Sequence, residues 1–340
     1  MNVFELTRAL VDIDSVTPNE EKVGLYLADL LSGLAAQTGG QVETIEVEPH
    51  RFNVLATWGQ PIVTFSTHID TVPPFFPSRE DEQWIWGRGA CDTKGIIASM
   101  VHAVEGLLSE GVRGIALLFV VGEERNSAGA LTAAKQSRGS RFIINGEPTE
   151  NKLALGSKGA LRFEVTARGR MAHSAYPQLG ESAIEKLLDA LERVRRIPLG
   201  HDPVLGASTL NIGTIHGGRA PNVIPDYASA EVFIRIVDSG DAFRAAIAEA
   251  VAGFAEAREV LCIPALHMAT LPSDAMARFE TTVVSYTTDI PAFGGAWGRP
   301  FLIGPGSIHF AHTDEERVPK AELLEAIEIY KQLARQLITQ

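Results

Sequence analysis

The feature that most limits the fold of this chain is a set of short apolar runs that end on acidic or histidine side chains. The first run is Pro61-Ile62-Val63-Thr64-Phe65, followed by Ser66-Thr67-His68-Ile69-Asp70. A short apolar run of this kind predicts a buried strand. His68 and Asp70 are two residues apart, so on a strand they point to the same face. A strand end with a capping aspartate and an incidental histidine would explain this triplet alone, so its meaning depends on the rest of the chain.

The same arrangement recurs further along the chain. The apolar run 113–121 ends at Gly122-Glu123-Glu124, and the run 141–145 ends at Gly146-Glu147. Adjacent carboxylates at the end of a buried strand are costly unless they are solvated or bound to a positive group. A surface loop is the simpler alternative for Glu123 and Glu124, but the long apolar run before them favours a cleft.

Asp92 lies in a glycine-rich stretch, Gly87-Arg88-Gly89-Ala90-Cys91-Asp92-Thr93-Lys94-Gly95, just ahead of a helix predicted over 96–108. Taken alone, this position indicates a helix cap. Near the other end of the chain, His309 and His312 follow another glycine-rich stretch, Gly304-Pro305-Gly306. Isolated acids and histidines therefore follow several apolar runs or glycine-rich turns.

The order of elements predicts an α/β fold with an inserted second domain. Helices are expected over 1–14 and 20–34, with Thr17 capping the second and Glu20 completing a capping box. From residue 161 the pattern changes to β-α-β-β-α-β, the ferredoxin-like motif. Its elements are strands 161–167, 208–215, 228–237 and 260–266 and helices 181–195 and 241–257. We therefore expect a mixed, mostly parallel sheet flanked by helices from residues 1–157 and 269–340, interrupted by a ferredoxin-like α+β domain over 158–268.

Composition narrows the class of partner. The formal net charge of the 340 residues is -12, which argues against nucleic acid and anionic membranes as partners. Apolar residues make up 45% and charged residues 21%, which is ordinary for a soluble protein. No apolar stretch approaches the length of a membrane helix, and the amphipathic N-terminus does not resemble a signal peptide. The two cysteines form no disulfide framework, so a reduced, cytoplasmic setting is expected.

If the strand ends meet at one edge of a sheet, several carboxylates and two histidines would gather there. Like charges at that density need cations or strongly raised pKa values. A two-metal centre is the simplest solution, and mixed histidine and carboxylate ligands suit zinc, with cobalt or manganese as alternatives.

These motifs together resemble one family. The stretches S-T-H-I-D-T-V-P, G-R-G-A-C-D-T-K-G, V-V-G-E-E, N-G-E-P-T, M-A-H-S-A-Y-P, A-P-N-V-I-P-D and G-P-G-S-I-H-F-A-H-T-D-E occur in the order seen in zinc-dependent acetylornithine deacetylases, succinyl-diaminopimelate desuccinylases, aminoacylases and glutamate carboxypeptidases. Each motif alone is weak, but seven in order are specific. The resemblance covers nearly the whole chain, from about Ser15 to Glu316.

The resemblance assigns roles to the residues of these motifs. It implies that two zinc ions are bound, with Asp92 bridging them and Glu123 acting as general base. It also implies that Asp70 orients the His68 ring and that a cis peptide bond follows Asp92. The implied metal ligands are His68, Asp92, Glu124, Glu147 and His312. His309 is the nearby alternative to His312 as a metal ligand, and it is assigned a surface or supporting position.

The resemblance also implies roles for the inserted domain. In the family it forms a homodimer, and the histidine of the motif that contains His173 reaches the partner subunit's active site and stabilises the oxyanion. The alternative for His173 is a loop histidine with no role. Arg219 and Asn222 are predicted to bind the substrate carboxylate, with loop structuring as the alternative for Asn222.

The expected substrate is a small N-acyl amino acid. Tyr286-Thr287-Thr288-Asp289-Ile290-Pro291 resembles the Y-C-T-E-A-P stretch of acetylornithine deacetylases. Asp289 is predicted to bind an ammonium group. N-acetylornithine or a related N-acetylated basic amino acid is therefore the first prediction, which implies a role in arginine biosynthesis. The alternatives are a dinuclear zinc exopeptidase acting on dipeptides or C-terminal residues, a succinyl-diaminopimelate desuccinylase, and a non-catalytic binding protein, against which the intact Glu123 and ligand set argue.

Overall fold

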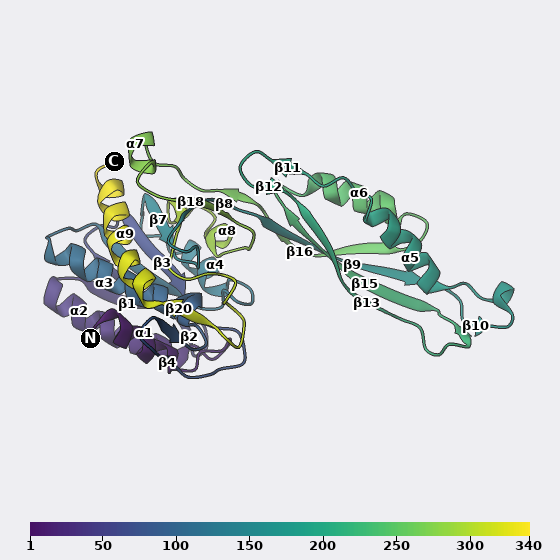
Figure 1. Cartoon of the computed structure of the whole chain (residues 1–340), viewed down its shortest axis with the longest axis horizontal. Helices are drawn as coiled ribbons and strands as arrows, with labels where there is room; N and C mark the ends of the chain where they lie inside the picture. The colour runs from purple at the N-terminus through teal and green to yellow at the C-terminus, as the bar shows by residue number, and fades with distance from the viewer. The chain divides into compact units, whose positions relative to one another are not determined.

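The computed structural model describes all residues from Met1 to Gln340 and divides into two compact units. The first unit comprises Met1–Leu155, Met268–Thr282 and Thr288–Gln340, and the second comprises Gly156–His267 and Val283–Thr287. Both chain termini belong to the first unit (Figure 1). No helix is long and apolar enough to cross a membrane.

The first unit is built on a six-stranded sheet in the order β1-β2-β6-β3-β7-β19. Three of its five pairings are parallel and two are antiparallel, so the mixed, mostly parallel sheet predicted from the sequence is confirmed. Its strands are β1 Gln41–Glu48, β2 Arg51–Trp58, β3 Val63–His68, β6 Ile115–Val120, β7 Phe142–Asn145 and β19 Arg299–Leu302.

Helices cover both faces of this sheet because its central strands are apolar on both sides. Every residue of β6 is buried: Leu117 and Phe119 belong to one core cluster, and Leu118 and Val120 to another. Residues of α1, α2, α3 and α9 complete the larger cluster, and residues of α4 and α8 the smaller. The helices are α1 Val3–Val11, α2 Glu21–Thr38, α3 Gly95–Ser109, α4 Ala128–Ala134, α7 Ser273–Met276, α8 Ile290–Phe293 and α9 Lys320–Ile338.

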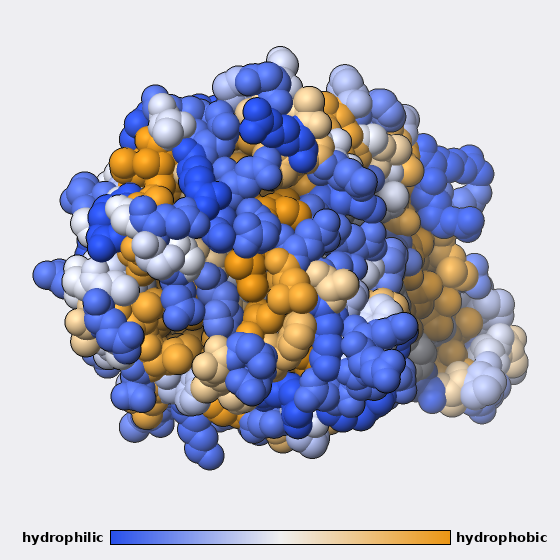
Figure 2. Space-filling view, turned by 60° about the vertical axis from the view of Figure 1, so that its left-hand side comes forward, coloured by the Kyte–Doolittle hydropathy of each residue, from blue (hydrophilic) through white to orange (hydrophobic).

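A small three-stranded sheet, in the order β20-β5-β4, lies beside the turn that carries Asp92. β4 is Arg79–Glu80, β5 is Trp84–Trp86 and β20 is Arg317–Pro319. A π-helical turn, η1 Ala90–Lys94, leads from β5 into α3. Figure 2 shows a mostly hydrophilic surface with small hydrophobic patches, and the large hydrophobic residues exposed on the first unit, such as Leu25 and Leu131, are few.

The second unit has the predicted ferredoxin-like order. Its sheet runs β13-β15-β9-β16 with every pairing antiparallel, and the side chains of α5 and α6 pack with the sheet in one core cluster. Its elements are β9 Gly159–Arg168, α5 Ala183–Val194, β13 Thr209–Gly217, β15 Tyr227–Ile236, α6 Asp241–Val251 and β16 Glu256–Ile263. The shorter segments are β10 Ala172–His173, η2 Pro177–Leu179, β11 His201–Asp202, β12 Gly206–Ala207 and β14 Val223–Ile224.

Two local predictions were wrong. The helix expected to reach residue 257 ends at Val251, and β16 begins at Glu256, because Gly253 takes a φ of +80° that ends the helical path. Thr17 does not cap α2, whose first turn has no side-chain cap. Its hydroxyl donates instead to Asp70, 53 residues away.

The chain passes between the units within β8 Leu153–Ser157, after β17 Leu266–His267, within β18 Thr281–Val284 and after Thr287. The sequence placed these boundaries at 157/158 and 268/269, and the second unit additionally takes in Val283–Thr287.

Candidate metal centre

Three neighbouring strands of the first unit place candidate side chains at one edge of the sheet. β3 ends at His68, β6 is followed by Gly122-Glu123-Glu124, and β7 is followed by Gly146-Glu147. β3 pairs in parallel with both β6 and β7. The carboxyl ends of parallel strands meet at one edge, where ligands bind in open α/β sheets.

Asp92 is presented on the tight turn between β5 and α3. Gly89 takes a φ of +85°, and a Cβ there would lie 2.8 Å from Cγ2 of Thr71, so a side chain does not fit. The peptide bond between Asp92 and Thr93 is cis. No side chain caps α3, so Asp92 is not a helix cap, and it contacts His68 instead.

Four side chains meet at this edge. Nε2 of His68 lies 3.0 Å from Oδ1 of Asp92. Nε2 of His312 lies 3.0 Å from Oε1 of Glu124 and 3.4 Å from Oδ2 of Asp92. Ligand atoms of His68, Asp92 and Glu124 all lie within 4.8 Å of one another. Each carboxylate oxygen of Asp92 therefore faces a different histidine, Oδ1 facing His68 and Oδ2 facing His312.

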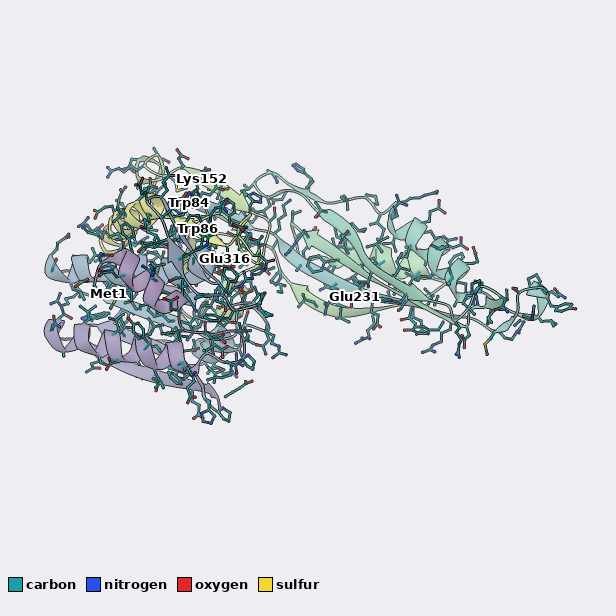
Figure 3. All side chains as sticks on the ribbon, turned by 60° about the horizontal axis from the view of Figure 1, so that its bottom comes forward. Met1, Trp84, Trp86, Lys152, Glu231 and Glu316 are labelled. Carbon is teal, nitrogen blue, oxygen red and sulfur yellow. The ribbon has the colours of Figure 1, made fainter.

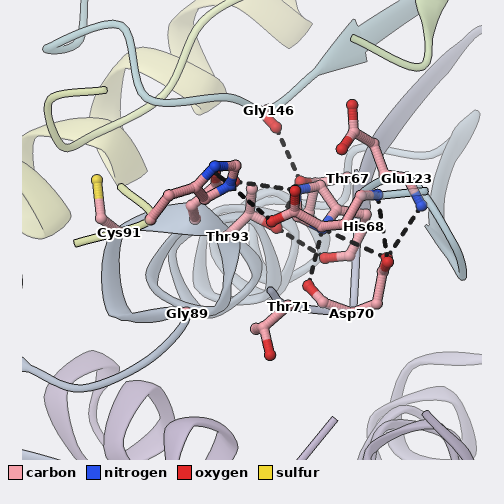
Figure 4. Close-up of polar contacts among 12 residues, drawn as sticks. Thr67, His68, Asp70, Thr71, Gly89, Cys91, Thr93, Glu123 and Gly146 are labelled. Atoms are coloured by element: carbon pink, nitrogen blue, oxygen red, sulfur yellow. Dashed lines mark hydrogen bonds and ion pairs between the residues drawn. The ribbon is translucent and has the colours of Figure 1, made fainter. Parts of the chain in front are cut away.

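Asp70 holds the residues around it rather than joining the cluster. Its backbone carbonyl lies 3.0 Å from Nδ1 of His68, and its Oδ1 lies 3.5 Å from the same atom. Its carboxylate also accepts from the Thr17 hydroxyl at 2.7 Å and from three backbone amides, and Figure 4 shows the contacts of Asp70 on the side of Glu123. These amides belong to Gly122, Glu123 and Glu124, at 2.9, 3.1 and 3.2 Å. Burial opposes ionisation of Asp70, but His68 above all, with Thr17 and the Glu123 amide, lowers the pKa of its carboxyl.

Glu123 and Glu147 have the opposite environment. Burial raises the pKa of both carboxyls well above the usual range; His68 opposes this, and the neighbouring carboxylates add to it. Oε1 of Glu147 is shielded from solvent and has no hydrogen-bond partner. A buried carboxylate without a donor is costly unless a cation binds it. This orphaned oxygen, together with histidine and carboxylate donors, fits a site for divalent metal ions.

The two histidines supply positive charge to this acidic cluster. Hydrogen bonds to Asp92 and Glu124 raise the pKa of His312 to about 10. Burial lowers the pKa of His68, but Asp70 and Asp92 outweigh it and hold that pKa well above its usual value. In return, the pKa of Asp92 lies well below its usual range in spite of burial, because both histidines donate to it. His309 is exposed and takes no part in these contacts.

Asp289 lies at the start of α8, near the same carboxylates. Burial raises its pKa to about 7, and the Ser127 hydroxyl and His68 oppose this effect. Both of its carboxylate oxygens are shielded from solvent, and Ser127 does not meet the geometry of a hydrogen bond to them. An ammonium group would neutralise Asp289, but a substrate reaches these oxygens only if the surrounding segments move.

The remaining predicted residues lie in the second unit. His173 is on β10, which pairs with β14 so that His173 faces Val223, next to Asn222. His173 is exposed, and its Nδ1 accepts from the amide of Ala175 at 3.1 Å. Arg219 is 63% exposed and already forms a two-bond ion pair with Asp226, at 3.1 and 2.9 Å.

No site role was assigned to Thr17, Glu316 or Arg235 from the sequence. Thr17 binds Asp70, and Glu316 accepts hydrogen bonds from the Asp92 turn. Arg235, on β15, has a shielded Nη1 with no partner, and burial lowers its pKa. An arginine on a strand carries no sequence signal that it lacks a partner, and the contacts of Thr17 and Glu316 span 53 and 224 residues. Glu316 is labelled in Figure 3, as is Glu231 on the sheet of the second unit.

The chain was compared with protein families and with known proteins. Residues 64–336 match the sequence model of peptidase family M20/M25/M40. A peptidase M20 domain-containing protein from Schizosaccharomyces pombe is 38% identical over 98% of this chain and 84% of its own length. A probable carboxypeptidase from Aspergillus niger is also 38% identical, over 96% of this chain and 87% of its own length.

Solved structures show the same fold at lower identity. Aminopeptidase PepT from Bacillus cereus has a TM-score of 0.82 at 20% identity, covering 99% of this chain and 98% of that chain. The Bacillus subtilis YxeP protein, described as a dinuclear metal-binding peptidase, has a TM-score of 0.71 at 17% identity, covering 99% of this chain and 97% of that chain.

Proposed function

Because the chain belongs to peptidase family M20/M25/M40, a family of hydrolases that act on amide bonds, we propose that it is a metal-dependent exopeptidase acting on short peptides. The observation that carries this proposal is the meeting of His68, Asp92 and Glu124 at one sheet edge. The names of the matched relatives favour a peptide over N-acetylornithine, which the sequence analysis placed first.

The proposed metal ions are two zinc ions, with cobalt or manganese as alternatives. Bound metals would lower the pKa of a water molecule and polarise the scissile carbonyl. The side chains that would hold them are His68, Asp92, Glu124, Glu147 and His312. Asp70 fixes the His68 ring and the backbone beside Glu123.

Glu123 is the proposed general base. It adjoins the ligand Glu124, has no side-chain hydrogen bond of its own, and its raised pKa brings its protonation closer to neutral pH. It would accept a proton from the attacking water and pass it to the leaving amine. Because its backbone is held by Asp70, its carboxyl group starts from a fixed position.

The second unit would supply substrate contacts and form a homodimer, as the family resemblance implies. We assign His173 to the developing oxyanion of the partner subunit's site in the proposed dimer, because it is exposed and held by Ala175. For a substrate carboxylate, Arg235 is a better candidate than Arg219: Arg235 has an unpartnered guanidinium nitrogen, whereas Asp226 already neutralises Arg219. Asn222 remains the second polar group beside His173.

A deacylase acting on N-acylated basic amino acids is the second candidate. The observation in its favour is Asp289, a buried carboxylate without a partner near Glu123 and Glu124. If Asp289 binds an ammonium group, substrates that carry one should be preferred.

A substrate panel with the metal-loaded protein tests the proposal. Dipeptides, peptides with a blocked C-terminus, N-acetylornithine and neutral N-acetyl amino acids are compared by kcat/KM. The exopeptidase proposal predicts that dipeptides are turned over faster than the N-acetylated amino acids. Faster turnover of N-acetylornithine would replace it with the deacylase, and inactivity on the whole panel with metal bound would contradict both.

A further inference from the structure

Glu316 is a buried carboxylate that binds the turn carrying Asp92. Its Oε1 accepts hydrogen bonds from three backbone amides of that turn. The donors are Gly89 at 2.9 Å, Cys91 at 3.3 Å and Asp92 at 3.1 Å. Its backbone carbonyl accepts a fourth bond, from the amide of Gly87 at 3.1 Å. A single residue therefore accepts from half of the backbone amides between β5 and α3.

The other oxygen of Glu316 is occupied by Arg88. Nη1 of Arg88 lies 2.5 Å from Oε2, and both side chains are only 1% exposed. Arg88 is fixed in turn by the carbonyl of Pro74 at 3.2 Å and by the ring of Phe76, whose centroid lies 5.0 Å from the guanidinium carbon. Removing one partner of such a pair leaves the other buried and uncompensated.

Glu316 also lies on the segment that presents His312. It follows His312 by four residues and immediately precedes β20, which pairs with β5. The His312 segment and the Asp92 turn are therefore joined both by the ladder between β20 and β5 and by the Glu316 carboxylate. The side chains of His312 and Asp92 lie 3.4 Å apart at the candidate metal centre.

We propose that Glu316 is a positioning residue that, through Arg88 and the amides of the Asp92 turn, sets the bridging carboxylate and the His312 segment in register before metal binds. The inference rests on the proposed metal site. Partners that orient metal ligands typically change metal affinity or activity by about 10–100-fold when they are removed.

The test compares Glu316→Gln with the parent by chelator competition for zinc. Glutamine keeps the size of the side chain but removes the charge that Arg88 and the amides need, so zinc affinity should fall about 10–100-fold. Glu322→Gln is the matched control. Its carboxylate accepts from the amide of Gly306 at 2.7 Å without touching the Asp92 turn, and its zinc affinity should stay within about twofold of the parent.

Hydrogen exchange on the unsubstituted protein covers the case in which Glu316→Gln does not fold. The inference predicts that the amides of residues 89–92 are protected in the protein stripped of metal, to the same degree as with zinc bound. Rapid exchange of these amides without metal would overturn it, as would a folded Glu316→Gln that binds zinc like the parent. If the parent itself binds no zinc, the proposed function fails first, and the exchange result still decides whether Glu316 holds the turn.

Discussion

The carboxylates at the sheet edge fall into two groups with opposite environments. Asp70 and Asp92 accept several hydrogen bonds or face histidines, and their pKa values are lowered in spite of burial. Glu147 and Asp289 are buried and Glu123 is half-buried, but none of the three has a side-chain hydrogen bond of good geometry, and their pKa values are raised. The difference shows which groups the fold itself has neutralised and which still need a cation or a proton. We call Asp70 and Asp92 the anchored pair, of which Asp92 is also a proposed metal ligand, and Glu123, Glu147 and Asp289 the unpartnered three.

The largest effect that tests this division is expected from Glu123→Gln. If Glu123 moves the proton, the variant should lose about 10²–10⁴-fold in kcat while its metal content stays at the parent level. Metal analysis of the same sample checks that the metal content is unchanged. Glu315→Gln, at an exposed neighbour of the His312 segment, is the control and should keep normal turnover. A Glu123→Gln protein with near-normal kcat would show that Glu123 is not the general base.

His173→Ala tests the role assigned to the second unit. Loss of an oxyanion donor typically costs about 10²–10³-fold in kcat, and this loss should come without any loss of metal. His201→Ala, at another exposed histidine of the same unit, is the comparison variant. An unchanged kcat in His173→Ala would remove the oxyanion role.

Asp70→Asn tests the anchored group. Asparagine offers one oxygen in place of two and adds an N–H group that faces the amide donors of the Glu123 loop. Metal affinity and kcat should each fall about 10–100-fold. Thr17→Val removes a single donor to the same carboxylate and should have a smaller effect in the same direction. If Asp70→Asn keeps the metal affinity and kcat of the parent, the contacts of Asp70 with His68 and the Glu123 loop are not required for the site.

The smallest effect is a pH-dependent change in stability from Asp289→Asn. A carboxyl whose pKa is raised on folding contributes stability that is complete below its unfolded value and is lost as pH rises through the folded value. For Asp289 this window runs from about 4 to about 7. Without metal, Asp289→Asn should therefore raise Tm by a few degrees at pH 8 and change it little at pH 4. A Tm difference that is the same at both pH values would show that Asp289 does not ionise in the folded protein.

The general features of the fold followed from sequence because they depend on local patterns. The period and length of the apolar segments predicted the β-α-β-β-α-β unit and the mixed sheet. The acidic residues at strand ends indicated where the candidate ligands would gather. The grouping of carboxylates into anchored and unpartnered was not predictable, because it depends on distant donors. Thr17 was misread as a helix cap since its position before Pro18 fits one, and nothing local shows that its hydroxyl binds Asp70.

The substrate was less predictable than the site. Tyr286-Thr287-Thr288-Asp289 resembled one branch of the family, but a short motif does not report that Asp289 is enclosed. Arg219 was favoured because its motif matched, yet Asp226 already pairs with it. Whether an arginine is available depends on its neighbours in three dimensions, and Arg235, unlike Arg219, has a guanidinium nitrogen without a hydrogen-bond partner.

Calorimetric titration of the metal-stripped protein with zinc tests the central claim most directly. Measured at pH 7 in buffers of different ionisation enthalpy, it gives both the number of ions bound and the number of protons released. The proposed metal centre predicts two ions per chain and a net release of protons from the unpartnered carboxyls and His312. Binding of fewer than two ions, or binding without proton release, would contradict it.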